Sequence, residues 1–268
     1  MIADGKHIAQ TIENDLRERL AQQPSKRVCF VMLGENPASL QFVGMKTRMA
    51  ERLGISVSVE KLSEDIETDE LCTIVKTISS VGYDGIVIQL PLPKHIDTQK
   101  VLDTVPVAQD IDVLSTAAKE ALVQGNFTKI PPVARAVFEV LDFYKISLAG
   151  KDILIVGNGR LVGEPVATIL NHRKLPFHII NKKTSDEEKL LRLKSADIII
   201  SGVGSPHFIR PDMIKHGVVL VDAGTSGQSG KLVGDIDPAC TEIASLSTPV
   251  PGGIGLITVA CLFANLLE

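Results

Sequence analysis

A glycine-rich turn, Gly157 to Gly163, is the part of the sequence that most plainly predicts ligand binding. It follows the apolar run Ile153 to Val156 and opens a helical pattern. The first glycine permits a tight turn, the second lets a pyrophosphate approach the backbone, and the helix N-terminus offers N–H groups to phosphates. The G-x-G-x-x-x-G spacing is one residue longer than the usual fingerprint, but strand before and helix after are the context it requires. The turn predicts dinucleotide binding; the alternative is a structural turn with glycines only for sterics.

The residues after the next expected strand bear on the type of dinucleotide. NAD enzymes usually carry an Asp or Glu there, about 20 residues after the turn, to bind the ribose hydroxyls. This chain has Asn181, Lys182 and Lys183 instead. Lysine ammonium groups suit the extra phosphate of NADP. We therefore expect NADP, with NAD possible; the alternative is a solvated lysine pair on a surface loop.

Phe42 and Lys46 lie four residues apart in a helical pattern that spans 39–53, so they share one face of the expected helix. A lysine in a partly apolar cleft can have a lowered pKa and serve as an acid or base. The alternative is a core contact beside a surface lysine. A functional role for Phe42 and Lys46 is favoured because the helix that carries them begins just after the end of a strand.

Polar residues also follow the third expected strand. Gln89 stands near its end, and Pro91 and Pro93 cannot continue a central strand because proline lacks an N–H. Ligands of open α/β sheets bind beyond such strand ends. Asp110 and Asp112 follow in an irregular stretch, where an acid could bind a nitrogen-rich ring by paired hydrogen bonds.

The tail segment from Thr248 to Gly255 is the most unusual stretch of the chain. It holds two prolines, which fix φ, and three glycines within four residues, which allow close approach of the backbone to a ligand. We expect a ligand-facing loop rather than a structural turn, with Thr258 beginning the last helix.

Helices and strands alternate along the chain. Helices are expected over 8–20, 37–54, 68–79, 134–143, 162–172, 187–194 and 257–267, and strands over 28–33, 57–62, 85–90, 153–156, 177–180, 198–201 and 218–221. This order predicts an α/β fold with mostly parallel sheets. Residues 105–130 are less regular, and the domain boundary is expected there or just after 134–143.

Composition excludes several classes of protein. A net charge of -4 gives no sign of a nucleic-acid partner, and no apolar run is long enough to span a membrane. No signal peptide is expected. The four cysteines match neither a disulfide framework nor a zinc site, so we expect core thiols, no metal and a cytoplasmic location.

Together these features resemble the methylenetetrahydrofolate dehydrogenase/cyclohydrolase family over nearly the whole chain. The most specific landmarks are Gln89-Leu90-Pro91-Leu92-Pro93 and Pro249-Val250-Pro251-Gly252-Gly253. The others follow in the family's order: Pro37-Ala38-Ser39 with Lys46, Asp110-Ile111-Asp112, the turn from Gly157 to Pro165, and Gly234-Asp235-Ile236-Asp237.

The resemblance implies oxidation of methylene-tetrahydrofolate by NADP to methenyl-tetrahydrofolate, then hydrolysis to formyl-tetrahydrofolate, in one-carbon metabolism and purine biosynthesis. It implies two α/β domains with a cleft between them: an N-terminal αβα folate-binding catalytic domain over 1–125 and a Rossmann-type NADP-binding domain over 126–256. The tail helix, 257–268, is expected to pack back on the first domain. A homodimer through the cofactor domain is also implied.

The resemblance assigns roles to individual residues. Lys46 is the expected participant in the proton transfers of hydrolysis, Gln89 orients it, and Asp112 binds the pterin. Substrate contacts are expected at Phe42, Val43, Gly44, Met45, Lys46, Ile88, Gln89, Leu90, Asp112, Pro251, Gly252, Gly253, Ile254, Gly255 and Thr258. Cofactor contacts are expected at Gly157, Asn158, Gly159, Arg160, Val162, Gly163, Lys182 and Thr225.

The first half of the chain departs from the family pattern at several positions. Phe42 stands where the family usually has Tyr, so the ring remains but the hydroxyl is lost. Gln109 replaces a Lys, and Val113 replaces a Gly. The family's Pro-Cys-Thr-Pro segment is Pro131-Pro132-Val133-Ala134 here.

The cofactor turn departs as well. Asn158 and Gly159 replace an Arg and a Ser that help to hold the NADP phosphate, and Lys182 stands where a phosphate-binding serine is common. We interpret Lys182 and the nearby Arg160 as compensation.

Two alternatives to the bifunctional enzyme stay open. The first is a folate- and nucleotide-binding relative with reduced or lost cyclohydrolase activity, which Phe42 favours. The second is another small-substrate dehydrogenase of the same architecture, against which the tail motif argues.

Overall fold

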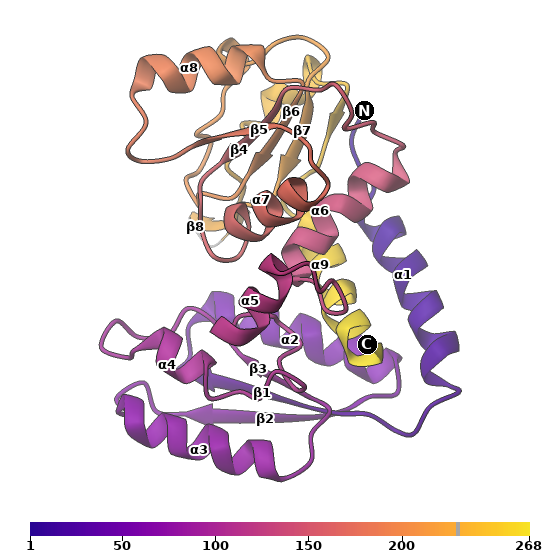
Figure 1. The fold of residues 1–268 in the computed structure, drawn as a ribbon, viewed down its shortest axis with the longest axis vertical. Helices are drawn as coiled ribbons and strands as arrows, with labels where there is room; N and C mark the ends of the chain where they lie inside the picture. Colours follow the sequence, from indigo (N-terminus) through magenta and orange to yellow (C-terminus); the bar gives the residue numbers. More distant parts are fainter. Residues whose placement is uncertain (229–230) are drawn as a thin grey trace. The chain divides into compact units, whose positions relative to one another are not determined.

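The structure is a computed structural model that describes residues 1–228 and 231–268 (Figure 1). The chain divides into two compact units, which we name by their sheets. The three-stranded unit comprises Ile12–Pro132 and Val259–Glu268, and the five-stranded unit comprises Met1–Thr11 and Val133–Thr258. The divisions at 11/12 and 258/259 fall inside helices α1 (Gly5–Leu20) and α9 (Ile254–Ala264), so each of these helices contributes to both units.

The three-stranded unit is built on a parallel sheet in the order β2-β1-β3. The central strand β1 (Arg27–Leu33) is buried at every position after the first, which is why it is a continuous apolar run. Strands β2 (Ser56–Leu62) and β3 (Gly85–Ile88) flank it. The helices of this unit are α2 (Pro37–Arg52), α3 (Thr68–Ser80), α4 (Thr98–Leu102) and α5 (Thr116–Val123).

Local signals set the limits of α2, the helix that carries Lys46. The Asn36 Oδ1 accepts hydrogen bonds from the N–H groups of Ala38 and Ser39, so it caps the helix start. Beyond the other end, Gly54 has a φ of 71°, in the region that favours glycine. The predicted helix is therefore confirmed, and it ends two residues earlier than expected.

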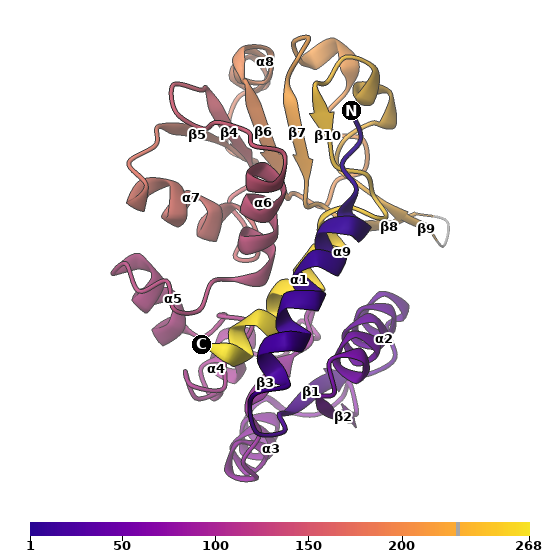
Figure 2. The ribbon, with the colours of Figure 1, turned by 90° about the vertical axis from the view of Figure 1, so that its right-hand side faces the viewer.

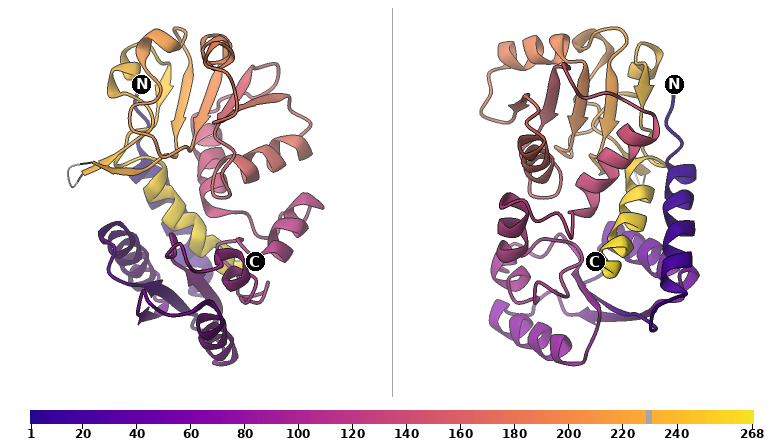
Figure 3. Two further views of the ribbon diagram at one scale, coloured as in Figure 1. Left: turned by 90° about the vertical axis from the view of Figure 1, so that its left-hand side faces the viewer. Right: turned by 45° about the vertical axis from the view of Figure 1, so that its right-hand side comes forward.

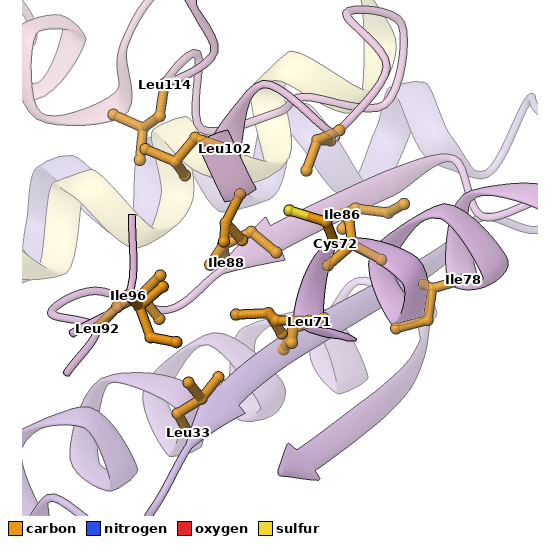
Figure 4. Packing of buried hydrophobic residues seen from close by; sticks show 14 of the residues in the cluster. Leu33, Leu71, Cys72, Ile78, Ile86, Ile88, Leu92, Ile96, Leu102 and Leu114 are labelled. Atoms are coloured by element: carbon orange, nitrogen blue, oxygen red, sulfur yellow. The ribbon is translucent and has the colours of Figure 1, made fainter. Parts of the chain in front are cut away.

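Apolar side chains of α3 and the sheet form the core of this unit. Figure 4 shows Leu71, Cys72 and Ile78 of α3 close to Ile86 and Ile88 of β3. Each of these five side chains is buried, and they belong to one continuous cluster. The cluster holds β3 in place, and with it the residue that follows, Gln89.

The end of the chain belongs to the three-stranded unit. Asn265 begins the short 3₁₀-helix η3 (Asn265–Leu267) and is buried. Its Nδ2 donates to the carbonyl oxygens of Ile111, at 2.8 Å, and Ile130, at 2.9 Å. These bonds link the tail to the segment that carries Asp110 and Asp112.

The five-stranded unit has a parallel sheet in the order β10-β7-β6-β4-β5, and Figure 2 shows these strands side by side. Figure 3 shows the same strands from two further directions. The strands are β4 (Ile153–Val156), β5 (Phe177–Ile180), β6 (Ile198–Ser201), β7 (Val219–Asp222) and β10 (Leu246–Ser247). The helices are α6 (Pro132–Phe143), α7 (Gly163–His172) and α8 (Asp186–Ser195), with 3₁₀-helices η1 (Pro211–Met213) and η2 (Pro238–Glu242). An antiparallel pair, β8 (Ser226–Gln228) and β9 (Lys231–Val233), completes the unit.

The direction of chain winding reverses at β4. The chain places β5 on one side of β4, then crosses back and places β6 and β7 on the other side. Ligands of open α/β sheets bind outside the carboxyl ends of the strands at such a reversal. The glycine turn directly follows β4, and the loop after β6 starts beside it. The α/β fold with parallel sheets is thus confirmed, and the sheet order indicates where its ligand site lies.

Some predicted boundaries were wrong. Strand β3 ends at Ile88 rather than Leu90, because the prolines at 91 and 93 have no N–H to extend the ladder. Helix α9 begins at Ile254, so Thr258 lies inside it and its Oγ1 donates to the Ile254 carbonyl oxygen at 2.9 Å. The stretch expected to be irregular contains α5, which starts after the capping residue Ser115.

Candidate active site

Lys46 is a buried lysine, with only 9% of its surface exposed. Its Nζ donates to the Gln89 Oε1 at 3.1 Å and lies 3.9 Å from the Asp112 Oδ2. The same nitrogen stands 6.0 Å from the centroid of the Phe30 ring on β1. Three residues from separate parts of the sequence, Lys46, Gln89 and Asp112, therefore meet within the three-stranded unit.

The surroundings shift the pKa values of Lys46 and Asp112 toward each other. Burial lowers the pKa of the Lys46 ammonium, and the nearby Asp112 carboxylate partly opposes this. Burial raises the pKa of Asp112, with Lys46 opposing and Asp110 adding to the rise. Both shifts favour the neutral forms. An amine and a carboxyl group with displaced pKa values can exchange protons with a bound molecule, which is the property that acid–base catalysis requires.

Gln89 is held in a fixed orientation. Its main-chain N–H donates to the Val31 carbonyl oxygen at 2.8 Å, which continues the pairing of β3 with β1. Its side-chain Nε2 donates to the Leu90 carbonyl oxygen at 2.7 Å. The amide nitrogen is thereby occupied, so the Oε1 is the atom that faces Lys46. The geometry gives Gln89 a position from which it can orient the lysine.

The two neighbouring acids have different surroundings. Asp110 is buried and accepts hydrogen bonds from the N–H groups of Leu114 and Ser115 and from the Ser115 hydroxyl. It shapes the turn before α5. Asp112 is the acid that faces Lys46, and its side chain is 21% exposed, so it can also reach a ligand.

The other predicted substrate residues of α2 and β3 differ in exposure. Phe42, Gly44, Met45 and Leu90 are partly exposed. Val43 is buried, and Ile88 packs in the hydrophobic core of the three-stranded unit, so both side chains stabilise the fold.

The tail residues lie at the end of the five-stranded unit. Pro251 is exposed, Gly252, Gly255 and Thr258 are partly exposed, and Gly253 and Ile254 are buried. A Cβ on Gly253 would lie 2.5 Å from the Pro249 carbonyl oxygen, so this glycine is required by the loop's own packing. A Cβ on Gly255 would meet nothing within 4 Å. The sequence predicted that the tail glycines let a ligand approach the backbone. At Gly253 the missing side chain instead lets the loop pack against its own backbone.

The glycine turn has a tightly packed side and an open side. Gly157 has a φ of 95°, and a Cβ on Gly163 would overlap the Gly157 carbonyl oxygen. These two positions therefore accept only glycine without rearrangement. A Cβ on Gly159 would meet nothing within 4 Å, so the turn is open there. Asn158 is exposed and Val162 is buried.

Two features of this turn fit a phosphate-bearing dinucleotide. The residue before α7, Val162, provides no side-chain cap, but the Glu164 N–H already donates to the Gly159 carbonyl oxygen and Pro165 has no N–H, so the start of that helix offers an anion mainly its dipole. The Arg160 Nη1 is buried and has no hydrogen-bond partner within the described residues. A buried guanidinium nitrogen without an acceptor costs free energy, and a phosphate oxygen would satisfy it.

The remaining predicted cofactor residues, Lys182 and Thr225, are exposed. Asn181 forms a local turn, in which its Oδ1 accepts from the Lys183 N–H and its own N–H donates to the Thr184 Oγ1. This turn leaves Lys182 at the end of β5.

Two residues that the sequence did not single out contribute to these sites. Phe30 provides the ring near Lys46, and Asp222 is a buried acid at the carboxyl end of β7. Phe30 gave no signal, because it stands within an apolar strand. Asp222 did give a sequence signal, since it is a charged residue that ends the apolar run from Val218.

Family models also divide the chain into two domains, although they assign residues 3–11 to the first domain and 259–268 to the second, unlike the structural units. The catalytic-domain model of the tetrahydrofolate dehydrogenase/cyclohydrolase family matches residues 3–112, and the NAD(P)-binding-domain model of the same family matches residues 131–268. The chain belongs to the tetrahydrofolate dehydrogenase/cyclohydrolase family. The bifunctional protein FolD of Nautilia profundicola is 36% identical over 274 residues, which cover 100% of this chain and 96% of that protein.

Solved structures of family members are also similar. The bifunctional FolD enzyme of Campylobacter jejuni has a TM-score of 0.93 at 33% identity, covering 100% of this chain and 97% of its own. The Trypanosoma brucei family member, solved with NADP and an inhibitor, has a TM-score of 0.94 at 28% identity, covering 100% and 96%. The family resemblance of the sequence motifs is thereby confirmed.

Two features are absent from the described residues. None of their helices combines the length and apolar character needed to cross a membrane. No group of three or more His, Cys, Asp or Glu side chains among residues 1–228 and 231–268 could hold a metal ion.

Proposed function

We propose that this protein oxidises methylene-tetrahydrofolate to methenyl-tetrahydrofolate with NADP and then hydrolyses the product to formyl-tetrahydrofolate. The observation that carries the proposal is the contact of buried Lys46 with Gln89, at 3.1 Å, and with Asp112, at 3.9 Å. Membership of the family supports both reactions.

The first step is a hydride transfer, for which NADP supplies the acceptor when bound. It needs no protein base, so the contribution of the chain is to hold the folate carbon in position. Asp112 is suited to this, because a carboxyl group can form paired hydrogen bonds with a pterin ring. Its partial exposure leaves it accessible to that ring.

The hydrolysis requires proton transfers to and from water and the folate nitrogen. Lys46 performs them, because its lowered pKa makes the neutral amine available nearer to neutral pH than in an ordinary lysine. The Gln89 Oε1 accepts a hydrogen bond from the Lys46 Nζ and directs the amine toward the bound ring. In this role Gln89 is a positioning residue.

Further contacts follow the family pattern. The folate contacts include Phe42, Val43, Gly44, Met45, Ile88, Leu90, Pro251, Gly252, Gly253, Ile254, Gly255 and Thr258. The cofactor contacts include Gly157, Asn158, Gly159, Val162, Gly163 and Thr225, and Arg160 and Lys182 bind the extra phosphate of NADP. Support for Arg160 comes from its buried Nη1, which has no hydrogen-bond partner in the part of the chain that the structure describes.

A second candidate is a relative whose cyclohydrolase activity is reduced. It is favoured by Phe42, which lies one helical turn before Lys46 and has no hydroxyl where the family usually has one. In that case the dehydrogenase step persists and methenyl-tetrahydrofolate accumulates.

The domain bounds, cellular location, oligomeric state and pathway complete the proposal. The folate-binding domain covers 1–125, with the tail helix 257–268 against it, and the NADP-binding domain covers 126–256. The protein is a cytoplasmic homodimer of one-carbon metabolism that supplies purine biosynthesis. Family resemblance supports these assignments, and sedimentation of the purified protein tests the dimer.

The direct test mixes purified protein with methylene-tetrahydrofolate and either NADP or NAD. The proposal expects reduced cofactor with both, and a higher kcat/KM with NADP. Absence of reduced cofactor in both mixtures would contradict the dehydrogenase assignment.

A further inference from the structure

Two buried aspartates of the five-stranded unit have no part in the proposed chemistry. Asp222 ends β7 and is 2% exposed, and Asp235 follows β9 and is 0% exposed. Buried carboxylates are costly unless they accept several hydrogen bonds. Neither pairs with a cation in the described part of the chain. Their partners are main-chain N–H groups and, for Asp235, also the Ser201 hydroxyl, and the location of these groups indicates what the aspartates do.

Asp235 binds the loop that follows β6. Its Oδ2 accepts from the Val203 N–H, at 2.8 Å, and from the Ser201 hydroxyl, at 2.8 Å. Its Oδ1 accepts from the Ser205 N–H at 2.7 Å. Both oxygens are therefore occupied in fixing the path of 201–205.

Asp222 in turn fixes Asp235. The Asp222 Oδ1 accepts from the N–H groups of Gly224, at 3.0 Å, and Asp235, at 3.2 Å. Its Oδ2 accepts from the Ile236 N–H at 2.9 Å. The two carboxylates thus form one hydrogen-bonded arrangement that joins the loops after β6, β7 and β9.

Glycines make room for both carboxyl groups. A Cβ on Gly224 would overlap the Asp235 carboxylate, and a Cβ on Gly234 would overlap the Asp222 carboxylate. The backbone can approach the acids this closely only because these positions lack side chains. Close packing leaves the carboxylates no alternative position.

The loop held by Asp235 supports the glycine turn. The Gly202 N–H donates to the Val156 carbonyl oxygen at 3.0 Å, and a Cβ on Gly157 would lie 2.7 Å from the Val203 Cγ1. A Cβ on Gly202 would run into the Val162 side chain. Residues 202 and 203 therefore pack directly against both ends of the turn, where the sheet order reverses and a ligand is expected.

We propose that Asp235, supported by Asp222, is a positioning residue for the dinucleotide: it holds loop 202–205 against the glycine turn and so sets the affinity for NADP without touching it. The inference rests on the proposed function, because it takes the dinucleotide to be NADP. It adds a determinant of affinity outside the turn itself. Asp235 has no exposed surface, so its effect passes through the main chain of the loop.

Isothermal titration of NADP into the purified full-length protein and its variants tests this. Asp235→Asn replaces two acceptor oxygens by one oxygen and an NH₂ group, so at least one loop N–H loses its acceptor. We expect the NADP Kd to rise about tenfold or more. The KM for methylene-tetrahydrofolate stays within about twofold, because the substitution acts on the loop that supports the glycine turn.

Two variants separate positioning from a general loss of stability. Asp237→Asn changes an acid two residues away whose side chain caps η2 through the Ala239 N–H. Ser201→Ala removes one hydrogen bond to Asp235 but keeps both loop N–H bonds. Both variants are expected to bind NADP within about twofold of the parent, although Ser201→Ala lowers the melting temperature.

The outcomes are distinguishable. If the parent protein binds no NADP, the proposed function fails and this inference fails with it. If the parent binds NADP and folded Asp235→Asn binds it equally well, the inference alone is overturned. The inference is also overturned if the NADP Kd rises in proportion to the loss of melting temperature across all variants, because a general loss of stability would then explain the weaker binding. Should Asp235→Asn not fold, Asp222→Asn provides the test, with a smaller rise in Kd expected because it acts on the loop through Asp235.

Discussion

Lys46 shows how a residue's surroundings, more than its type, determine its chemistry. An exposed lysine remains charged near neutral pH, whereas burial lowers the pKa of Lys46 and Gln89 fixes the direction of its Nζ. Asp112 supplies a carboxyl whose raised pKa makes it a partner for the same proton. The proposed hydrolysis depends on this arrangement rather than on the lysine alone.

The missing hydroxyl at residue 42 is testable by restoring it. Phe42→Tyr adds a group that can hydrogen-bond one helical turn from Lys46. We expect the rate of methenyl-tetrahydrofolate hydrolysis to rise by about fivefold, since a well-placed hydrogen bond is worth roughly 1 kcal/mol. The measurement is the loss of methenyl absorbance above the spontaneous rate. A hydrolysis rate equal to the parent's would show that the ring alone suffices.

Arg160 determines cofactor preference if its Nη1, which has no partner among the described residues, donates a hydrogen bond to the extra phosphate of NADP. Arg160→Ala should then raise the KM for NADP by about tenfold or more, since hydrogen bonds to charged groups are worth roughly 1.5–3 kcal/mol. The KM for NAD should change little. Initial rates with each cofactor give both values. Arg173→Ala, at the end of α7, is the control; equal losses for NADP and NAD would remove the role proposed for Arg160.

At the scale of elements, the predicted bounds agree best with the structure where the sequence carries a clear local signal. Strands β4, β5 and β6 have the predicted bounds because each is a short apolar run between turn residues. Helix α5 was not expected, because its short sequence gives little helical periodicity and its start depends on a cap at Ser115. Tertiary contacts decide such elements, and a single sequence does not contain them.

The functional sites, like the helices and strands, were only partly predictable from the sequence. Lys46, Gln89 and Asp112 carried sequence signals, but their contact joins α2, the end of β3 and the stretch before α5. Without the family resemblance, no spacing rule would bring them together. Asp222 and Asp235 lie 13 positions apart in sequence, and their shared hydrogen bonds follow only from the folded loops.

Val113 is a point of strain next to the site. It is 2% exposed and has a φ of 58°, a backbone conformation that is unfavourable for a β-branched residue. Val113→Gly relieves a strain of about 1–2 kcal/mol while losing the buried side chain. Urea denaturation should therefore show a smaller loss of stability for Val113→Gly than for Val105→Gly, a buried loop residue without positive φ. Equal losses would mean that Val113 is unstrained.

Asp222 predicts a pH dependence of stability. Burial is the main cause that raises its pKa from 3.8 to about 7, with the charge of Asp235 adding to it. Between these pH values the folded protein holds a proton that the unfolded chain has released. The unfolding free energy contributed by this group therefore falls as pH rises from about 4 through 7, by about 4 kcal/mol at most.

Denaturation of the parent and Asp222→Asn at pH 5 and pH 8 isolates this contribution, because all other groups are shared. The parent should lose more stability between the two pH values than the variant does. An identical pH dependence in both proteins would contradict the raised pKa.

At the scale of the molecule, the two units divide the work that the proposed reactions require. The three-stranded unit contains the lysine that moves protons, and the five-stranded unit contains the glycine turn that fits a dinucleotide. Helices α1 and α9 contribute residues to both units. Substitution of Lys46, which serves only the proton transfers of hydrolysis, should therefore separate the two reactions.

The central claim is that one chain performs both reactions and that Lys46 serves only the second. The measurement is a single reaction with methylene-tetrahydrofolate and NADP in which NADPH and methenyl-tetrahydrofolate are followed together. The parent should form NADPH with little methenyl-tetrahydrofolate remaining. Lys46→Met should still form NADPH, within about tenfold of the parent rate, while methenyl-tetrahydrofolate accumulates because hydrolysis falls by about 10²-fold or more. Failure of the parent to form NADPH, or clearance of methenyl-tetrahydrofolate by Lys46→Met at the parent's rate, would contradict the account.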